Sequence, residues 1–204
     1  MPGCEETEAL ERAKAGDRKA FDALQTALQG SVWRFVDRLI GLSACTPDIV
    51  QNTFLALYLN IEKMQSPEHV KPFLFRVARN LCYDELRWRG RFQHVSLDSD
   101  EWDEQWPESL VVDLVDPSDL PDELAHVAGL WRQVQRAMDR LPELQRQTLI
   151  LYAEEDLTYA QIAETMNTDV GTVKSRIHNG RKNLLRYLKP KFLKELGIKR
   201  VDTL

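Results

Sequence analysis

The segment Leu141–Leu188 constrains the fold most, because it carries the pattern of two short helices separated by a polar turn. Thr158 and Gln161 form a capping box, which predicts that the first helix of the pair starts there. The polar turn 167–169 follows, and Thr168 is the expected N-cap of the second helix. This arrangement is typical of a helix-turn-helix, whose second helix lies in a DNA groove.

The second helix of the pair is predicted to have two different faces. Its apolar stripe, which would face the core, consists of Val173, Ile177, Leu184 and Leu188. Another side carries cationic and polar groups that can bind phosphates or base edges, namely Lys174, Ser175, His178, Asn179, Arg181 and Lys182. A solvated face on an ordinary helical bundle would also be charged. The cap, the turn length and the single sign of the charge together favour DNA binding.

The formal net charge of −5 looks unsuited to a nucleic-acid partner, but the charges are unevenly distributed. Residues 1–90 are neutral, with 12 basic and 12 acidic side chains. Residues 91–126 hold 1 basic and 11 acidic side chains, whereas residues 127–204 hold 14 basic and 9 acidic ones. The helix-turn-helix therefore lies in a basic part of the chain, as DNA binding requires.

Several function classes are not predicted. The apolar runs are short and interrupted, and the acidic N-terminus has no apolar signal region, so we expect no membrane insertion. Cys4, Cys45 and Cys82 are odd in number and widely spaced, which fits neither a disulfide framework nor a CxxC metal site. The histidines are scattered, and no HExxH motif or glycine-rich phosphate loop occurs. We expect a cytoplasmic protein with no catalytic residues, no metal and no cofactor.

The acidic segment also divides the chain. It contains three prolines and no sustained helical period, which indicates a linker. Apolar periods on both sides predict an all-α fold of two small helical domains. The expected units are a helical domain 1–91, a flexible acidic linker 92–123, a helix-turn-helix domain 124–190 and a basic tail 191–204. Helices are expected at 10–16, 20–28, 32–40, 48–61, 73–89 and 124–138 and from Pro142 onward, with a loop at 62–72.

Two separate stretches resemble one family. TPDIVQNTFLALY and KPFLFRVARNLCYDELRWRGR lie before the acidic linker, and LPELQRQTLILYAEEDLTYAQIAETMNTDVGTVKSRIHNGRKNLLRYL lies after it. In this order and spacing they resemble the bacterial extracytoplasmic-function (ECF) sigma factors. The resemblance implies two helical domains, sigma-2 and sigma-4, that bind core RNA polymerase and direct it to promoters. It also implies an anti-sigma factor as the usual regulator, although the sequence identifies none.

Three sites follow from the resemblance. Helix 48–58 would dock on the β′ clamp helices of polymerase, with Asp48, Gln51, Asn52 and Leu55 as contact candidates. The loop 63–69 and the helix 71–89 would open the −10 region and hold its single strand, through Lys71, Arg76, Arg79, Asn80, Tyr83 and Arg87. The third site would read the −35 element in the major groove through Thr172, Lys174, Ser175, His178, Asn179 and Arg181.

Some positions remain ambiguous or depart from the family. Trp88 fits either a base-stacking residue or a partly buried aromatic side chain. Asp169 stands where the family commonly has proline, and Asn52 where it often has glutamate. Asp169 suits the helix dipole but lies near the expected path of a DNA phosphate. The acidic linker fits a mimic of nucleic acid in a polymerase channel as well as it fits a solvated spacer.

Three rival functions give different signatures. A sigma-like decoy that only binds an anti-sigma factor should lose the basic residues of the reading helix, yet Lys174 and Arg181 are present. A stand-alone helix-turn-helix regulator would leave the first domain without a role and would give a palindromic footprint. An enzyme lacks support from any motif. We therefore expect a sigma factor that is a monomer when free and binds the β′ and β subunits of core polymerase and promoter DNA.

Overall fold

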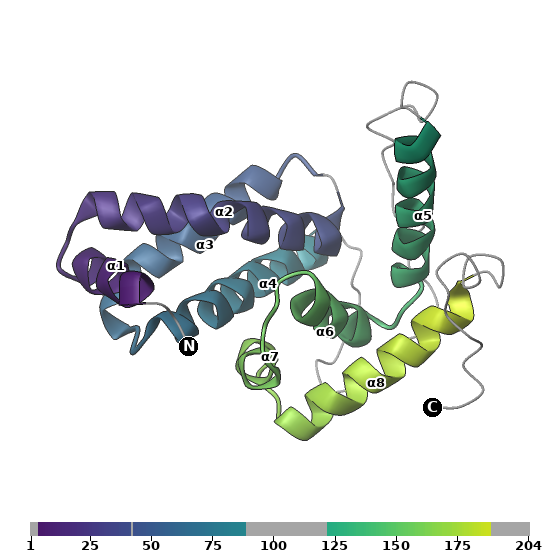
Figure 1. Ribbon diagram of the computed structural model, residues 1–204. Helices are drawn as coiled ribbons and strands as arrows, with labels where there is room; N and C mark the ends of the chain where they lie inside the picture. Colours follow the sequence, from purple (N-terminus) through teal and green to yellow (C-terminus); the bar gives the residue numbers. More distant parts are fainter. Residues whose placement is uncertain (1–3, 42, 89–121, 189–204) are drawn as a thin grey trace.

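A computed structural model describes residues 4–41, 43–88 and 122–188 of the chain. Every regular element in these ranges is a helix, which confirms the all-α prediction (Figure 1). The α-helices are α1 (Cys4–Lys14), α2 (Arg18–Ile40), α3 (Thr46–Asn60), α4 (Val70–Trp88), α5 (Asp122–Met138), α6 (Glu143–Ala153), α7 (Tyr159–Met166) and α8 (Val170–Tyr187). Two 3-10 turns, η1 (Ile61–Lys63) and η2 (Pro67–His69), join α3 to α4.

The N-terminal domain, residues 4–88, is built on α2, α3 and α4, which pack against one another. Its core contains the fully buried Phe35, Leu57 and Phe75. The rings of Phe35 and Phe75 meet edge to face with their centroids 5.0 Å apart, a favourable aromatic geometry. This core fixes which faces of α3 and α4 point outward.

The C-terminal domain, residues 122–188, contains the predicted helix-turn-helix as α7 and α8, packed on α6. Leu151, Ile162 and Val173 bring one buried side chain from each of these helices to the core. Gly180 allows α8 to lie close to α6, because a Cβ at this position would be 3.0 Å from Cδ1 of Leu149. Packing against Leu149, rather than a turn, therefore favours glycine at this position.

Several predicted boundaries were wrong. The expected helices 20–28 and 32–40 are one continuous helix, α2, because Gly30 is accommodated inside it. Helix α4 begins at Val70 rather than near Phe73, since a proline is tolerated in a first helical turn. The N-cap of α8 is Asp169, not Thr168. The capping box of α7 is present as predicted.

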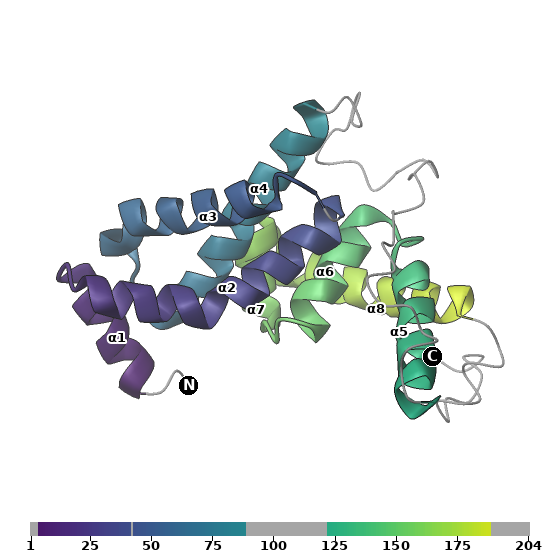
Figure 2. The same cartoon turned by 90° about the horizontal axis from the view of Figure 1, so that it is seen from above.

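The two domains pack against each other. Their buried apolar side chains form one continuous cluster, and α7 lies alongside α4 in both views (Figures 1 and 2). Helix α5 rises from the C-terminal domain, away from α7 (Figure 1). The predicted linker 92–123 falls outside the described residues except for the start of α5, and the predicted tail 191–204 lies outside them entirely.

Candidate nucleic-acid interface

The predicted −35 reader lies on α8. Asp169 caps the helix, because its carboxylate accepts a hydrogen bond from the backbone N–H of Thr172 at 2.8 Å and another from the Thr172 hydroxyl at 2.6 Å. These bonds hold the pKa of Asp169 below its ordinary value. Lys174 and Arg181 are exposed on this helix, as are Ser175, His178 and Asn179. Five of the six predicted −35 residues are thus accessible to solvent. The sixth, Thr172, is half-buried and bonded to the N-cap Asp169.

Arg181 is held by a stack of aromatic rings. Its guanidinium lies 4.9 Å from the centroid of the Tyr152 ring on α6. The Tyr152 ring in turn packs on Tyr159 of α7, with 5.4 Å between centroids. The stack ties α6, α7 and α8 together at one end of the predicted −35 surface. Sequence reasoning missed Tyr152, because nothing local to it signals that a cation from α8 covers its ring.

A hollow opens between the first turns of α6 and α8. Pro142, Gln145, Asp169, Ser175 and Asn179 are among its lining residues. One lining residue, Gln145, also accepts at its Oε1 a 2.9 Å hydrogen bond from the Nδ2 of Asn183, which fixes α8 against α6. The predicted −35 surface therefore has a concave, polar hollow beside the exposed cations of α8.

The predicted −10 surface on α4 is different, because two of its members are buried. Arg79 and Tyr83 are each 8% exposed. The Nε of Arg79 donates to the Oε1 of Gln147 on α6 at 2.9 Å, and the Nε2 of Gln147 donates to the Tyr83 hydroxyl at 2.6 Å. The same amide nitrogen also donates to Glu143 at 2.6 Å. Burial, with the nearby Glu143 charge, raises the pKa of Tyr83.

The other predicted −10 residues remain nearer the solvent. Asn80 and Arg87 are exposed, and Arg87 pairs with Asp84 at 3.1 Å one turn earlier in the helix. Lys71 is half-buried, and so is Arg76. Trp88 is 85% exposed at the last residue of α4, so the alternative of a partly buried aromatic side chain was wrong. The structure therefore divides the predicted −10 set into a buried pair and an exposed remainder.

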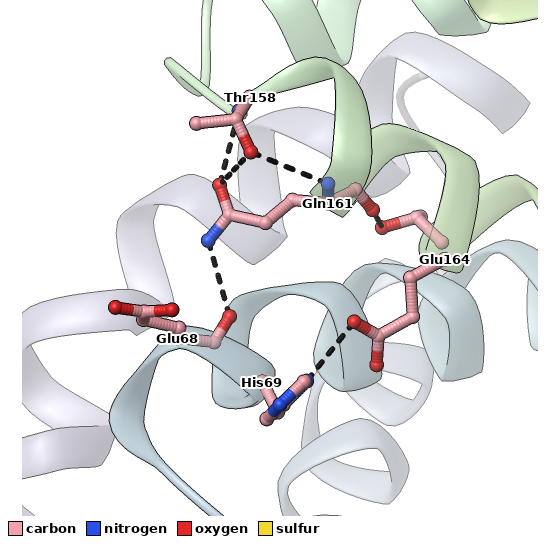
Figure 3. Close-up of polar contacts among 6 residues, drawn as sticks. Glu68, His69, Thr158, Gln161 and Glu164 are labelled. Carbon is pink, nitrogen blue, oxygen red and sulfur yellow. Dashed lines mark hydrogen bonds and ion pairs between the residues drawn. The ribbon is translucent and has the colours of Figure 1, made fainter. Parts of the chain in front are cut away.

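The loop before α4 is also covered (Figure 3). Gln161 of α7 accepts at its Oε1 from the backbone N–H of Thr158, completing the capping box, and its Nε2 donates to the Glu68 carbonyl at 3.1 Å. Three residues further along α7, the Oε2 of Glu164 lies 3.0 Å from the Nδ1 of His69. The η2 turn is therefore held by two side chains of α7.

The predicted polymerase-docking residues share the outer face of α3. Asp48, Gln51, Asn52 and Leu55 are all exposed. Tyr58 and Leu59 continue this face at 58% and 69% exposure. Sequence reasoning missed both, although their spacing from Leu55, three and four residues on, is that of a helical face. The outer face of α3 is thus an exposed apolar strip.

Metal or thiol chemistry finds no support in the described ranges. No group of three or more His, Cys, Asp or Glu side chains that could hold a metal occurs in residues 4–41, 43–88 or 122–188. Neither Cys45 nor Cys82 forms a disulfide within the described residues. Burial strongly raises the pKa of the Cys82 thiol, which disfavours the reactive thiolate. Among the described helices, none combines the length and apolarity needed to span a membrane.

Known proteins match both domains in the same order. A family model of sigma-70 region 2 matches residues 24–92, and a model of sigma-70 region 4 matches residues 131–184. The ECF RNA polymerase sigma-E factor of Escherichia coli strain K12 is 30% identical over 185 residues, which cover 89% of this chain and 93% of that protein. The chain belongs to the ECF RNA polymerase sigma factors. As a member of this family it is a transcription-initiation factor.

Other ECF sigma factors match over a similar extent of this chain. SigW of Bacillus subtilis is 27% identical over 182 residues, covering 88% of this chain and 95% of SigW. SigE of Mycolicibacterium smegmatis is 33% identical over 176 residues, covering 85% of this chain but 64% of SigE. Sigma factor RpoE of Bartonella quintana, solved with the anti-sigma factor NepR, shares the fold with a TM-score of 0.59 and 21% identity, covering 89% of this chain and 99% of RpoE.

Proposed function

We propose that this ECF sigma factor brings core RNA polymerase to promoters by reading a duplex −35 element with α8 and holding the single-stranded −10 element with α4. The observation that carries the proposal is the cationic face of α8. It holds Lys174, His178 and Arg181 in the open, behind a capped helix-turn-helix. Each good contact between such side chains and a base edge discriminates by about 1–3 kcal/mol.

The outer face of α3 supports the polymerase part of the proposal. Leu55, Tyr58 and Leu59 present apolar surface in a row, flanked by the polar Asp48, Gln51 and Asn52. An exposed apolar strip with a polar border is typical of a protein-binding surface. This strip is the proposed contact with the β′ clamp helices, while the second domain would reach the β subunit.

The proposed organisation is a sigma-2 domain at 1–91, a linker at 92–123, a sigma-4 domain at 124–190 and a tail at 191–204. Core polymerase would hold the two domains at a fixed distance, which makes the second contact with DNA intramolecular and so strengthens binding overall. The protein would do no chemistry of its own and would act in the cytoplasm as a monomer. An anti-sigma factor is its proposed regulator, because the related RpoE was solved bound to one.

Transcription in vitro tests the proposal. Purified core polymerase, this protein and a pool of genomic promoter fragments should yield specific start sites that depend on the protein. Replacing Lys174→Ala together with Asn179→Ala should remove them, because both side chains lie on the reading face. Arg136→Ala is the matched control, since Arg136 is exposed on α5 outside every proposed site. Polymerase binding without transcripts would indicate a decoy, and no polymerase binding would overturn the proposal.

A further inference from the structure

The C-terminal domain covers the −10 surface at two separate places. On α4, Arg79 and Tyr83 both form hydrogen bonds with the amide of the fully buried Gln147 of α6. On the η2 turn, Gln161 and Glu164 of α7 hold the backbone of Glu68 and the ring of His69 (Figure 3). Two of the six side chains proposed to hold single-stranded DNA, Arg79 and Tyr83, are therefore in contact with the C-terminal domain, and so is the turn that precedes α4.

The contact made by Gln147 has the chemistry of a nucleobase edge. Its carbonyl oxygen accepts from the Arg79 guanidinium while its amide nitrogen donates to the Tyr83 hydroxyl. Adenine and cytosine likewise place a donor amino group beside an acceptor nitrogen. The Arg79 guanidinium also lies 4.9 Å from the centroid of the Tyr83 ring, so both groups are held in one arrangement. A base entering this place would have to displace the amide.

Charged groups also pair across the interface between the two domains. Arg34 of α2 faces Glu155 at 3.8 Å, and Arg38 faces Glu154 at 3.4 Å. His69 and Glu164 form a third pair at 3.0 Å. In all three pairs the basic group belongs to the N-terminal domain and the carboxylate to the C-terminal domain. The carboxylates meet a basic surface as the phosphates of a DNA strand would.

The −35 reader is not covered in the same way. Lys174, His178 and Asn179 are exposed although the two domains are packed together. Closure therefore separates the two DNA-binding activities, because it blocks one site and leaves the other accessible.

We propose that the C-terminal domain is an intramolecular competitor for single-stranded −10 DNA, with the Gln147 amide in the place of a base. The free protein can read duplex DNA with α8 but must open before it can hold a melted strand. This inference rests on the proposed role of α4. It goes beyond that role by assigning an inhibitory function to α6 and α7. No second protein is needed for the inhibition.

The test compares an opened variant with a matched control. Gln147→Ala combined with Glu164→Ala removes the contacts to Arg79, Tyr83 and His69. Gln145→Ala is the control, because Gln145 is also a glutamine of α6 but its side chain accepts a hydrogen bond from Asn183 in its own domain. Small-angle X-ray scattering reports opening as a larger radius of gyration. Fluorescence anisotropy measures binding of a short labelled oligonucleotide carrying the non-template −10 strand of a promoter mapped by transcription.

We expect the opened variant to have a larger radius of gyration and to bind the oligonucleotide about tenfold more tightly, as when a closed state that fills roughly 90% of molecules is removed. The control should bind like the wild type. Adding Arg79→Ala to the opened variant should abolish the gain. Opening without tighter binding would overturn the inference, as would a wild type that already binds as tightly as the opened variant. A radius of gyration that does not change would also overturn it.

Two further measurements separate the possible failures. Glu154→Gln breaks the contact with Arg38 of α2, and it replaces the opened variant if that one fails to fold. Transcription with core polymerase is measured on every variant. Promoter-specific transcripts without a gain in oligonucleotide binding would reject the competitor and retain the sigma factor. A complete lack of polymerase binding would reject the proposed function itself.

Discussion

The two helices proposed to contact DNA, α4 and α8, have similar residues but opposite environments. Helix α8 shows Lys174, His178 and Arg181 to the solvent, whereas α4 has Arg79 and Tyr83 buried beneath α6. Both helices have an apolar stripe and a polar side, so the difference lies in what covers the polar side. That of α4 is covered by α6, whereas that of α8 is open to solvent. The difference teaches that a polar helix face marks a binding surface without telling which molecule occupies it. In the closed molecule α4 binds the protein's own second domain.

The largest effect that we predict is a loss of stability in the C-terminal domain, which carries the exposed helix α8. Gly180→Val should destabilise the C-terminal domain by about 1–3 kcal/mol, because the new side chain meets Leu149 in a well-packed core. Urea unfolding measures this loss, and binding of a −35 duplex should fall with it. Gly129→Ala on α5 is the control. A Cβ there meets nothing within 4 Å, so it should be neutral or gain up to roughly 1 kcal/mol. Equal effects at the two glycines would contradict the packing role of Gly180.

A salt titration sharpens the comparison directly. Lys174→Ala should lower the slope of log affinity against log salt for a −35 duplex by about 1, as expected for one lost phosphate contact. Arg79→Ala should leave that slope unchanged in the free protein, since Arg79 is buried. The measurement is fluorescence anisotropy of a labelled duplex over a range of potassium chloride. A slope that falls equally in both variants would mean that α4 is accessible after all.

A smaller effect concerns the ring stack behind the reading face. A double-mutant cycle of Tyr152→Leu and Arg181→Ala should give a coupling of about 0.5–1 kcal/mol in thermal or urea unfolding, the usual size of an exposed cation–π contact. Tyr152→Phe retains the ring and should retain most of the coupling. Strictly additive single effects would show that Arg181 is free to contact DNA instead.

The smallest predicted effect is the response of closure to pH. Burial raises the pKa of Glu155, an effect that the Ser31 hydroxyl, Arg34 and Lys71 partly offset and the neighbouring Glu154 reinforces. The closed form therefore binds this proton more tightly than an open form with an ordinary carboxyl. The proton on Glu155 stabilises the closed form fully at pH values below the ordinary carboxyl pKa. This stabilisation is lost as the pH rises through the raised pKa of Glu155. Mild acid should thus favour closing.

Glu155→Gln isolates that response, because it keeps the shape of the side chain and cannot titrate. The radius of gyration of the wild type should decrease on acidification more than that of the variant. The other ionisable groups of the interface are identical in the two proteins, so their contributions cancel in the comparison. An identical pH response in the two proteins would show that the Glu155 carboxyl does not report closure.

Local patterns predicted much of the fold because helices are local structures. The apolar period of α8, the capping box at Thr158 and the outward position of Leu55 all follow from spacings of three or four residues. The continuity of α2 through Gly30 was missed because tertiary packing overrides the low helix propensity of one glycine. Each of these outcomes lies within a single helix or its immediate neighbours.

The burial of α4 could not be predicted in this way. Arg79 and Gln147 are 68 residues apart, so no local spacing relates them. A weak signal exists in α6, where Glu143, Arg146 and Gln147 are polar yet buried in a helix otherwise rich in leucine. Buried polar groups require partners, but a sequence does not say where the partners lie. The division of the −10 set into buried and exposed members is therefore information that only the tertiary structure contains.

The oxygen and the nitrogen of the Gln161 side-chain amide make two different contacts. Its oxygen belongs to the start of α7, while its nitrogen reaches the Glu68 carbonyl of the other domain. Gln161→Glu would exchange a single NH₂ group for an oxygen, keeping the capping acceptor that a glutamate supplies equally well and losing the donor to Glu68. On this one variant, circular dichroism would measure helix content, and small-angle scattering would measure domain closure separately. One nitrogen atom of this chain thus contributes to the docking of α7 without contributing to the start of that helix.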